Sequence, residues 1–191
     1  MIRAFVAIDL PDDLGKDVQN LLASLQDLPD SGLIRWVKPQ ALHLTLAFLG
    51  NINRDRIPEI AASLQEAART CVPFECRLTD LGAFPNWRKA RILHLEVDDP
   101  TGGLKRIQHQ VQSALSPLGF QPDRRAFSPH LTLGRVRDRA SRNSLDELNN
   151  RVQNVRMPDF KPWYVKEIHF VQSDLLPSGP QYSRLGSFEL D

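Results

Sequence analysis

"KPQALHLTLAFLG" (residues 38–50) and "AFSPHLTLGRVR" (residues 126–137) contain the same tetrapeptide, HLTL. The chain has five His and five Thr in all, and the two copies hold two of each. Successive side chains of a strand point to opposite faces, so His43 and Thr45 share one face while the leucines between and after them share the other. The second copy follows the same rule. We therefore expect two strands that each present a His/Thr pair.

Length and composition bound the class of protein. The 191 residues are 41% hydrophobic, which is enough for one domain over 1–191, with two small lobes that share a cleft. A formal net charge of +1 excludes the pervasive basicity of proteins that wrap long nucleic acid, so contact with nucleic acid should be local. The two cysteines, Cys71 and Cys76, lack zinc or redox spacing, and no 18 apolar residues run together. We expect a cytoplasmic monomer with reduced thiols and no membrane contact.

Hydrophobic periodicity predicts a mixed order of strands and helices. Period-two patterns predict strands over 2–9, 33–37, 42–50, 74–84, 90–97, 130–136, 163–175 and 182–190. Helical spacing predicts helices over 14–28, 54–70 and 101–116, and a fourth that opens at "SLDE" with Ser144 and Glu147 as a capping box. This mixture of βα and ββ units indicates an α+β fold with antiparallel sheets. The repeated HLTL predicts a duplicated lobe with approximate two-fold symmetry.

The repeat also narrows the chemistry. One H-x-T on a strand is more often a half-buried histidine than a site, but two copies with matched flanks favour a site made of His43, Thr45, His130 and Thr132. The sequence has no P-loop, G-x-G-x-x-G or H-E-x-x-H motif, and each copy offers only one imidazole, so catalysis without metal is favoured. Two opposed imidazoles suit one general base and one general acid, and threonine hydroxyls can donate to phosphate oxygens. The set suits in-line phosphoryl transfer.

Five blocks of the sequence together resemble one family. They are "RAFVAIDLP" (3–11), "RWVKPQALHLTLAFLG" (35–50), "LGAFPNWRKARILHLEV" (81–97), "FSPHLTLGRV" (127–136) and "SDLLPSGPQYSRL" (173–185). In this order they resemble the two-histidine phosphoesterase superfamily, in its RNA 2′,3′-cyclic phosphodiesterase branch, also called 2′-5′ RNA ligase. The resemblance implies a bilobed α+β fold, in which antiparallel sheets with outer helices form two pseudo-symmetric lobes around a central cleft.

The resemblance also implies roles for residues. His43 and His130 would be the catalytic pair, Thr45 and Thr132 would hold the phosphate, and Arg135 would contact the substrate. The reaction would open a 2′,3′-cyclic phosphate to a 2′-phosphate with no metal, ATP or other cofactor, with 2′-5′ RNA ligation as its reverse. Its partners would be RNA ends, tRNA halves among them, or small nucleotides. We assign His130 as the base toward water and His43 as the acid toward O3′.

Several assignments stay open on the sequence alone. Strict alternation from His130 turns Arg135 away from the cleft, unless a bulge at Gly134 re-aims it. Phe48 has the parity of the leucines and is predicted in the core, whereas Arg3 and Phe5 are weaker candidates for the cleft. An aromatic side chain could stack on a base beside the reacting phosphate, and four stay open between this role and a structural one: Trp36, Phe84, Trp87 and Tyr182. The remaining histidines are assigned structural roles: His94, His109 and His169. A non-catalytic RNA-end binding module and a metal phosphoesterase are the alternative functions.

Overall fold

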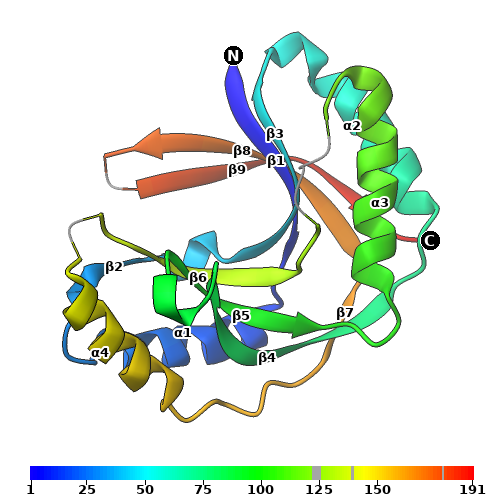
Figure 1. Ribbon diagram of the computed structural model, residues 1–191. Helices are drawn as coiled ribbons and strands as arrows, with labels where there is room; N and C mark the ends of the chain where they lie inside the picture. The colour runs from blue at the N-terminus through cyan, green and yellow to red at the C-terminus, as the bar shows by residue number, and fades with distance from the viewer. Residues whose placement is uncertain (122–125, 139, 178) are drawn as a thin grey trace.

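The computed structural model describes residues 1–121, 126–138, 140–177 and 179–191. Within these ranges the chain forms four α-helices, five 3-10 helices and nine strands (Figure 1). The α-helices are α1 (Asp12–Gln26), α2 (Ile57–Arg69), α3 (Gly103–Leu115) and α4 (Arg142–Gln153). The 3-10 helices are η1 (Ser31–Leu33), η2 (Pro39–Ala41), η3 (Arg54–Arg56), η4 (Trp87–Lys89) and η5 (Ser116–Leu118). The strands are β1 (Ile2–Asp9), β2 (Ile34–Trp36), β3 (His43–Ile52), β4 (Phe74–Phe84), β5 (Ile92–Asp98), β6 (His130–Val136), β7 (Trp163–Val165), β8 (Glu167–Leu176) and β9 (Gly179–Glu189).

The strands form one antiparallel sheet with two halves. Their order is β7-β4-β5-β6-β3-β1-β8-β9, and β2 adds to β6 beside this path. The two HLTL strands, β3 and β6, are neighbours at the centre, where a single residue pair, Leu44 with Leu131, joins them. One half is therefore β3-β1-β8-β9 and the other is β7-β4-β5-β6 with β2. The expected α+β fold with antiparallel lobes is confirmed, and the lobes are parts of one continuous sheet.

The sheet is curled, and the short connection between β7 and β8 requires this. β7 pairs with β4 at one end of the strand order and β8 pairs with β1 in the other half, yet only Lys166 separates β7 from β8. One residue spans at most about 3.6 Å, so β7 and β8 must approach each other although five strands separate them in the sheet. Figure 1 shows the strands around a curved surface. The single strand predicted over 163–175 is consequently two strands, since the chain changes partners at Lys166.

Helices cover the sheet with apolar faces that the sequence pattern predicts. α2 and α3 lie side by side and pack against β9 and β3 respectively (Figure 1). α1 buries leucine and valine side chains at helical spacing: Leu14, Val18, Leu21, Leu22 and Leu25. A fully buried Leu or Val contributes roughly 1.5–3 kcal/mol through removal of its surface from water. Within the described ranges, no helix has the length and apolar character that a membrane span requires.

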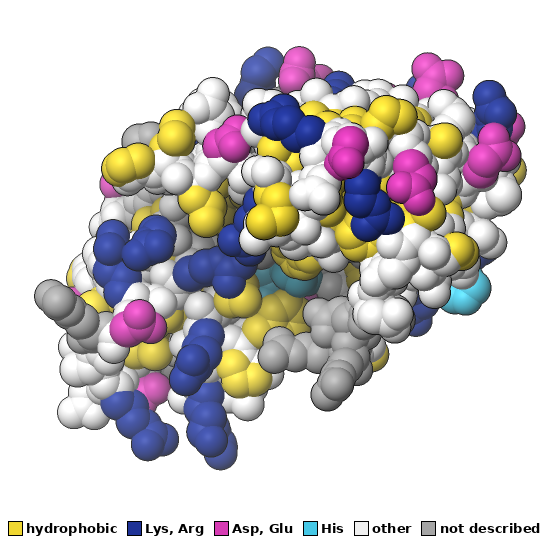
Figure 2. Space-filling model, turned by 90° about the horizontal axis from the view of Figure 1, so that it is seen from above, with side chains coloured by type: hydrophobic (Ala, Val, Ile, Leu, Met, Phe, Trp, Pro, Cys, Tyr) yellow, Lys and Arg dark blue, Asp and Glu magenta, His cyan; other side chains and the backbone are white. Residues whose placement is uncertain are grey.

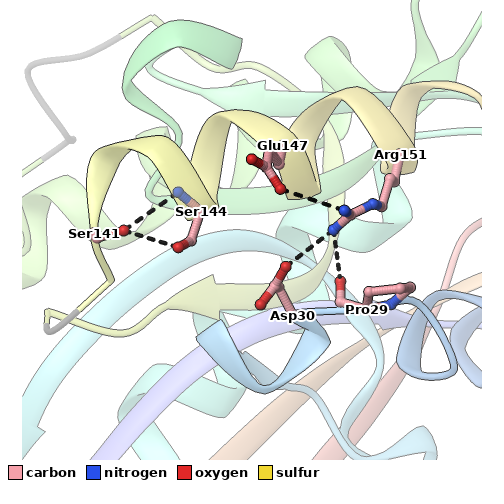
Figure 3. A network of polar contacts seen from close by, with 6 residues as sticks. All are labelled: Pro29, Asp30, Ser141, Ser144, Glu147 and Arg151. Atoms are coloured by element: carbon pink, nitrogen blue, oxygen red, sulfur yellow. Dashed lines mark hydrogen bonds and ion pairs between the residues drawn. The ribbon is translucent and has the colours of Figure 1, made fainter.

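Helix α4 begins three residues earlier than expected. Its N-cap is Ser141, whose hydroxyl accepts a hydrogen bond from the Ser144 backbone N–H at 3.3 Å (Figure 3). The predicted capping box at Ser144 and Glu147 is wrong, because Ser141 already caps the first turn. The Glu147 carboxylate instead accepts from Arg151 one turn later, at 3.3 Å. Arg151 also donates to Asp30 at 3.0 Å and so joins α4 to the segment after α1.

Two bulges in β3 change which side chains face the core. The pairing with β1 shifts at Leu46 and again at Leu49, so each of these leucines is an extra residue with no partner on β1. A bulge resets the alternation of faces. Phe48 therefore shares the face of Thr45, and 65% of its surface is exposed. The prediction that Phe48 packs in the core is wrong, since alternation was counted as if β3 were regular.

Candidate functional site

The two H-x-T pairs meet where the halves of the sheet join. Leu44 and Leu131, the joining pair, are both buried, so the residues on either side of each point to the opposite face. All four of those flanking side chains are half-buried: His43, Thr45, His130 and Thr132. The structure thus brings the four predicted site residues together on one face. Figure 2 shows a histidine at the floor of a hollow in the surface.

Both imidazoles are held in the same way. Nδ1 of His43 lies 2.9 Å from the carbonyl oxygen of Ala41, and Nδ1 of His130 lies 2.8 Å from that of Ser128. A carbonyl oxygen only accepts, so Nδ1 carries the proton in each ring. The Nε2 atom of a neutral ring then has a free lone pair, and that of a protonated ring has a proton to give. Each histidine is therefore oriented for proton transfer through Nε2.

Aromatic side chains support the His43 ring. Phe5 stacks on it with ring centroids 4.7 Å apart, and the Tyr182 ring meets it edge-on at 5.2 Å. Phe5 is 4% exposed, because it lies beneath these rings on the second face of β1. Burial lowers the pKa of His43, while the Ala41 carbonyl and the Asp9 carboxylate act in the opposite direction. The weak sequence assignment of Phe5 to the cleft thus has a geometric basis, as support for His43.

A second aromatic group surrounds His130. The Phe84 ring meets His130 edge-on at 4.9 Å, and His94 lies 5.4 Å from it. His94 stacks on Phe84 at 4.1 Å, is 4% exposed, and its Nδ1 has no hydrogen-bond partner among the described residues. Burial lowers its pKa to about 4. His94 was expected to be an ordinary strand residue, but it is a neutral ring packed against the site.

The burial of His94 predicts that acid destabilises the fold. Its pKa is about 6.5 when unfolded and about 4 when folded, so the unfolded state binds more protons between these values. Stability is therefore lost as pH falls from 6.5 toward 4. Between pH 7 and 5 this group alone should cost about 2 kcal/mol of unfolding free energy. Urea unfolding at both pH values should show that His94→Phe removes this loss.

His109 offers a matched control because it is exposed on α3. The His109→Phe variant should keep the pH dependence of the wild type. Equal pH dependence in wild type and His94→Phe would instead mean that His94 accepts a proton inside the fold. His43 and His169 also have pKa values lowered by burial, so part of the acid sensitivity should persist in every single variant.

Arg135 returns to the face of the histidines through a bulge. β5 pairs His94 with Thr132 and Leu93 with Gly134, which leaves Leu133 as an extra residue on β6. Leu133 and Gly134 are both buried, so the next side chain, Arg135, lies on the face of Thr132. The bulge that the sequence analysis required is present, one residue before the expected position. Arg135 is exposed and its charge acts on the Tyr182 hydroxyl.

A pocket of about 270 Å³ opens beside His43. Phe5 and Tyr182 line it together with the polar side chains of Asp9, Gln40 and Arg184. The Arg184 guanidinium forms an ion pair with the Asp9 carboxylate. Within the described parts of the chain, no three His, Cys, Asp or Glu residues are grouped so that they could hold a metal ion.

Sequence reasoning named the supporting aromatic residues as candidates but could not say which histidine each one contacts. Phe5, Phe84 and Tyr182 reach the site from three different strands, and their partners are far away in the sequence. The period-two pattern of β1 gives a signal for Phe5, because its second face is also apolar at Ala7. His94 gives a weaker signal: Gly82 faces it across β4 and β5, and a Cβ at Gly82 would lie 2.4 Å from its Nε2.

The chain resembles known proteins over nearly its whole length. A protein of Methanothermobacter thermautotrophicus named RNA 2′,3′-cyclic phosphodiesterase is 32% identical over 189 residues, 99% of each chain. Its namesake in Archaeoglobus fulgidus is 34% identical over 188 residues, 98% of this chain and 100% of the other. The crystal structure of the Thermus thermophilus protein TT0787 matches with a TM-score of 0.78 at 27% identity, over 99% of this chain and 98% of that one.

Escherichia coli LigT complexed with 3′-AMP matches similarly, with a TM-score of 0.77, 25% identity, and coverage of 99% of this chain and 98% of that one. The family described as the 2′-5′ RNA ligase superfamily matches residues 10–175, which include both H-x-T motifs. The resemblance expected from the five sequence blocks is thereby confirmed. This chain belongs to the 2′-5′ RNA ligase superfamily.

Proposed function

We propose that this chain is an RNA 2′,3′-cyclic phosphodiesterase in which His43 and His130 are the acid–base pair. The observation that carries the proposal is the equivalent anchoring of the two imidazoles, each with Nδ1 on the carbonyl two residues earlier and with no hydrogen bond to Nε2 among the described residues. Membership of the superfamily and the names of the curated relatives support the substrate class. Residues 1–191 would act as one domain.

The proposed reaction is an in-line displacement at phosphorus. A water oxygen forms a bond to phosphorus while the bond from phosphorus to O3′ breaks, which leaves a 2′-phosphate. One imidazole takes the proton of the water at Nε2, and the other gives its Nε2 proton to O3′. The hydroxyls of Thr45 and Thr132 donate to the non-bridging oxygens, and Arg135 contacts the substrate from farther along the same face of β6. No nucleotide energy source enters this scheme.

The pKa of His43 bears on which histidine is the base. Burial lowers this pKa, which favours the neutral ring that a general base requires. This direction supports His43 as the base toward water and His130 as the acid toward O3′. We therefore propose the reverse of the assignment made from the sequence. The four residues and the bonds that form and break are the same in both assignments.

The same site would also catalyse ligation, as a second reaction of the cyclic phosphate. A 5′-hydroxyl in place of water would form the bond to phosphorus while the bond from phosphorus to O3′ breaks, which creates a 2′-5′ linkage without ATP. The crystal structure of E. coli LigT complexed with 3′-AMP supports a nucleotide as the ligand of a similar cleft in this chain. Among RNA ends, tRNA halves are one proposed substrate. The cytoplasmic location and the monomeric state remain predictions from the sequence.

Incubation of the purified protein with a cyclic-phosphate-ended RNA in excess chelator tests the proposal. We expect turnover to a 2′-phosphate, identified by chromatography beside 2′- and 3′-monophosphate standards. Binding without turnover would favour the RNA-end binding module. Turnover that the chelator abolishes would favour a metal phosphoesterase. A predominant 3′-phosphate would show that O2′ leaves, and would exclude 2′-5′ ligation at the same site.

A further inference from the structure

Two arginines lie directly opposite each other beside the cleft. In the pairing of β2 with β6, Arg35 is the partner of Arg135. Both side chains are exposed. Residues directly opposite in an antiparallel pair have Cβ atoms about 4.5–5.5 Å apart, and like charges at such positions destabilise the sheet. The fold thus retains two positive charges where neutral side chains would be more stable.

Both arginines point away from the core, on the side of the catalytic face. Their neighbours along the strands, Ile34 and Gly134, are buried, and a Cβ at Gly134 would lie 2.4 Å from Cγ2 of Ile34. The opposite face of this strand pair is therefore the one that carries the guanidinium groups. Burial raises the pKa of Tyr182, and the charge of Arg135 opposes that rise. Arg135 consequently lies near the ring that supports His43.

The two charges lack an acidic partner within the described residues. The ion pairs there use other arginines, and neither Arg35 nor Arg135 takes part in one. Figure 2 shows that Lys and Arg side chains gather on one side of the hollow that holds the histidine. This is the side on which Figure 1 places β2. An anion bound between the two guanidinium groups would relieve their repulsion.

We propose that Arg35, together with Arg135, binds the phosphodiester that precedes the cyclic-phosphate nucleotide in an RNA chain. The proposal rests on the proposed function and makes the enzyme prefer an oligonucleotide to a mononucleotide. His130 and Arg135 are five residues apart on β6, roughly 15 Å between Cα atoms at ~3.3 Å per residue with one bulge. Strand side chains stand roughly perpendicular to the sheet, so the Arg135 guanidinium lies farther along β6 than the His130 imidazole, where a phosphate other than the reacting one would lie. Arginine also suits bidentate binding of phosphate.

Two substrates separate this contact from the chemistry. A nucleoside 2′,3′-cyclic monophosphate has only the reacting phosphate, whereas a dinucleotide ending in the same cyclic group has one phosphodiester more. We expect the wild type to have the higher kcat/KM for the dinucleotide. In Arg35→Gln the ratio of the two kcat/KM values should fall about tenfold. Arg69→Gln, which removes an exposed arginine on α2, should leave the ratio unchanged.

Salt dependence and stability provide independent measurements. Each phosphate contact on a single strand steepens the fall of log affinity with log salt by about 0.7. For the wild type, the ratio of kcat/KM for the dinucleotide to kcat/KM for the mononucleotide should therefore fall as salt rises. In Arg35→Gln the slope of this fall should be shallower by about 0.7. The melting temperature of this variant should equal or exceed that of the wild type, since one of two opposed charges is gone. A lower melting temperature with an unchanged ratio would assign Arg35 a purely structural role.

The outcomes also separate this proposal from the proposed function. If the wild type turns over both substrates and Arg35→Gln keeps the wild-type ratio and salt slope, the phosphodiester contact is wrong and the phosphodiesterase stands. If the wild type turns over neither substrate, the proposed function itself is wrong.

Discussion

Replacing His43 or His130 by alanine should lower kcat/KM for a cyclic-phosphate RNA by about 10²- to 10⁴-fold, the usual contribution of a general acid or base. Each variant loses the group on its side of the phosphate that is oriented to transfer a proton through Nε2. Because the two histidines act in one transition state, the double variant should be far less impaired than the product of the single effects. Steady-state kinetics on the three variants measures these losses.

Two controls keep the result interpretable. His109→Ala changes a histidine that is exposed on α3 and should retain the wild-type rate. Thermal unfolding should show that the alanine variants remain folded, since the rings of His43 and His130 are only half-buried. A folded variant of either histidine with a near wild-type rate would rule out the two-histidine mechanism.

A substrate with sulfur in place of the bridging O3′ should restore activity to His130→Ala but not to His43→Ala. A thiol ionises with a pKa of about 8.5, far more readily than an alcohol, so a sulfur leaving group departs without a general acid. If His43 is the base, as its lowered pKa favours, the loss in His130→Ala should largely disappear with this substrate. The expected recovery is as large as the loss, about 10²- to 10⁴-fold.

The converse pattern has a definite meaning. Rescue of His43→Ala alone would restore the assignment made from the sequence, with His43 as the acid. If neither variant recovered while the wild type cleaved the sulfur substrate, the leaving atom would not be the one at the 3′ position. Measurement of free thiol release reports directly on cleavage of that bond.

Periodicity and repetition predicted the features that depend on local sequence. The HLTL strands and the shared face of the four polar site residues follow from alternation along short segments, and the helices follow from helical spacing of apolar residues. Alternation failed at Phe48, because the bulge at Leu46 leaves no mark in the pattern of apolar residues. The sequence alone placed Arg135 on the face of the histidines only if β6 contained a bulge. The pairing of β5 with β6 contains that bulge.

Contacts between side chains of different strands could not be predicted from the sequence. Phe5 and Tyr182 both enclose His43, but nothing in the sequence says that β1, β8 and β9 are neighbours. His94 was assigned a structural role for the same reason, because its packing against His130 depends on the pairing of β5 with β6. The start of α4 was misplaced because two serines, Ser141 and Ser144, both suit an N-cap, and only the hydrogen bond distinguishes them.

The matching carbonyl tethers of the two histidines have a consequence for anyone who wishes to drive ligation. Hydrolysis and joining differ only in the nucleophile that attacks the cyclic phosphate, so the same base would take its proton and the same acid would serve O3′ in both, each through the Nε2 atom that the tether directs. Substituting either histidine would therefore slow both reactions together. The ratio of the two products is set by the competition between water and 5′-hydroxyl ends, so a variant that favours joining must keep water out of the cleft and leave the imidazoles untouched.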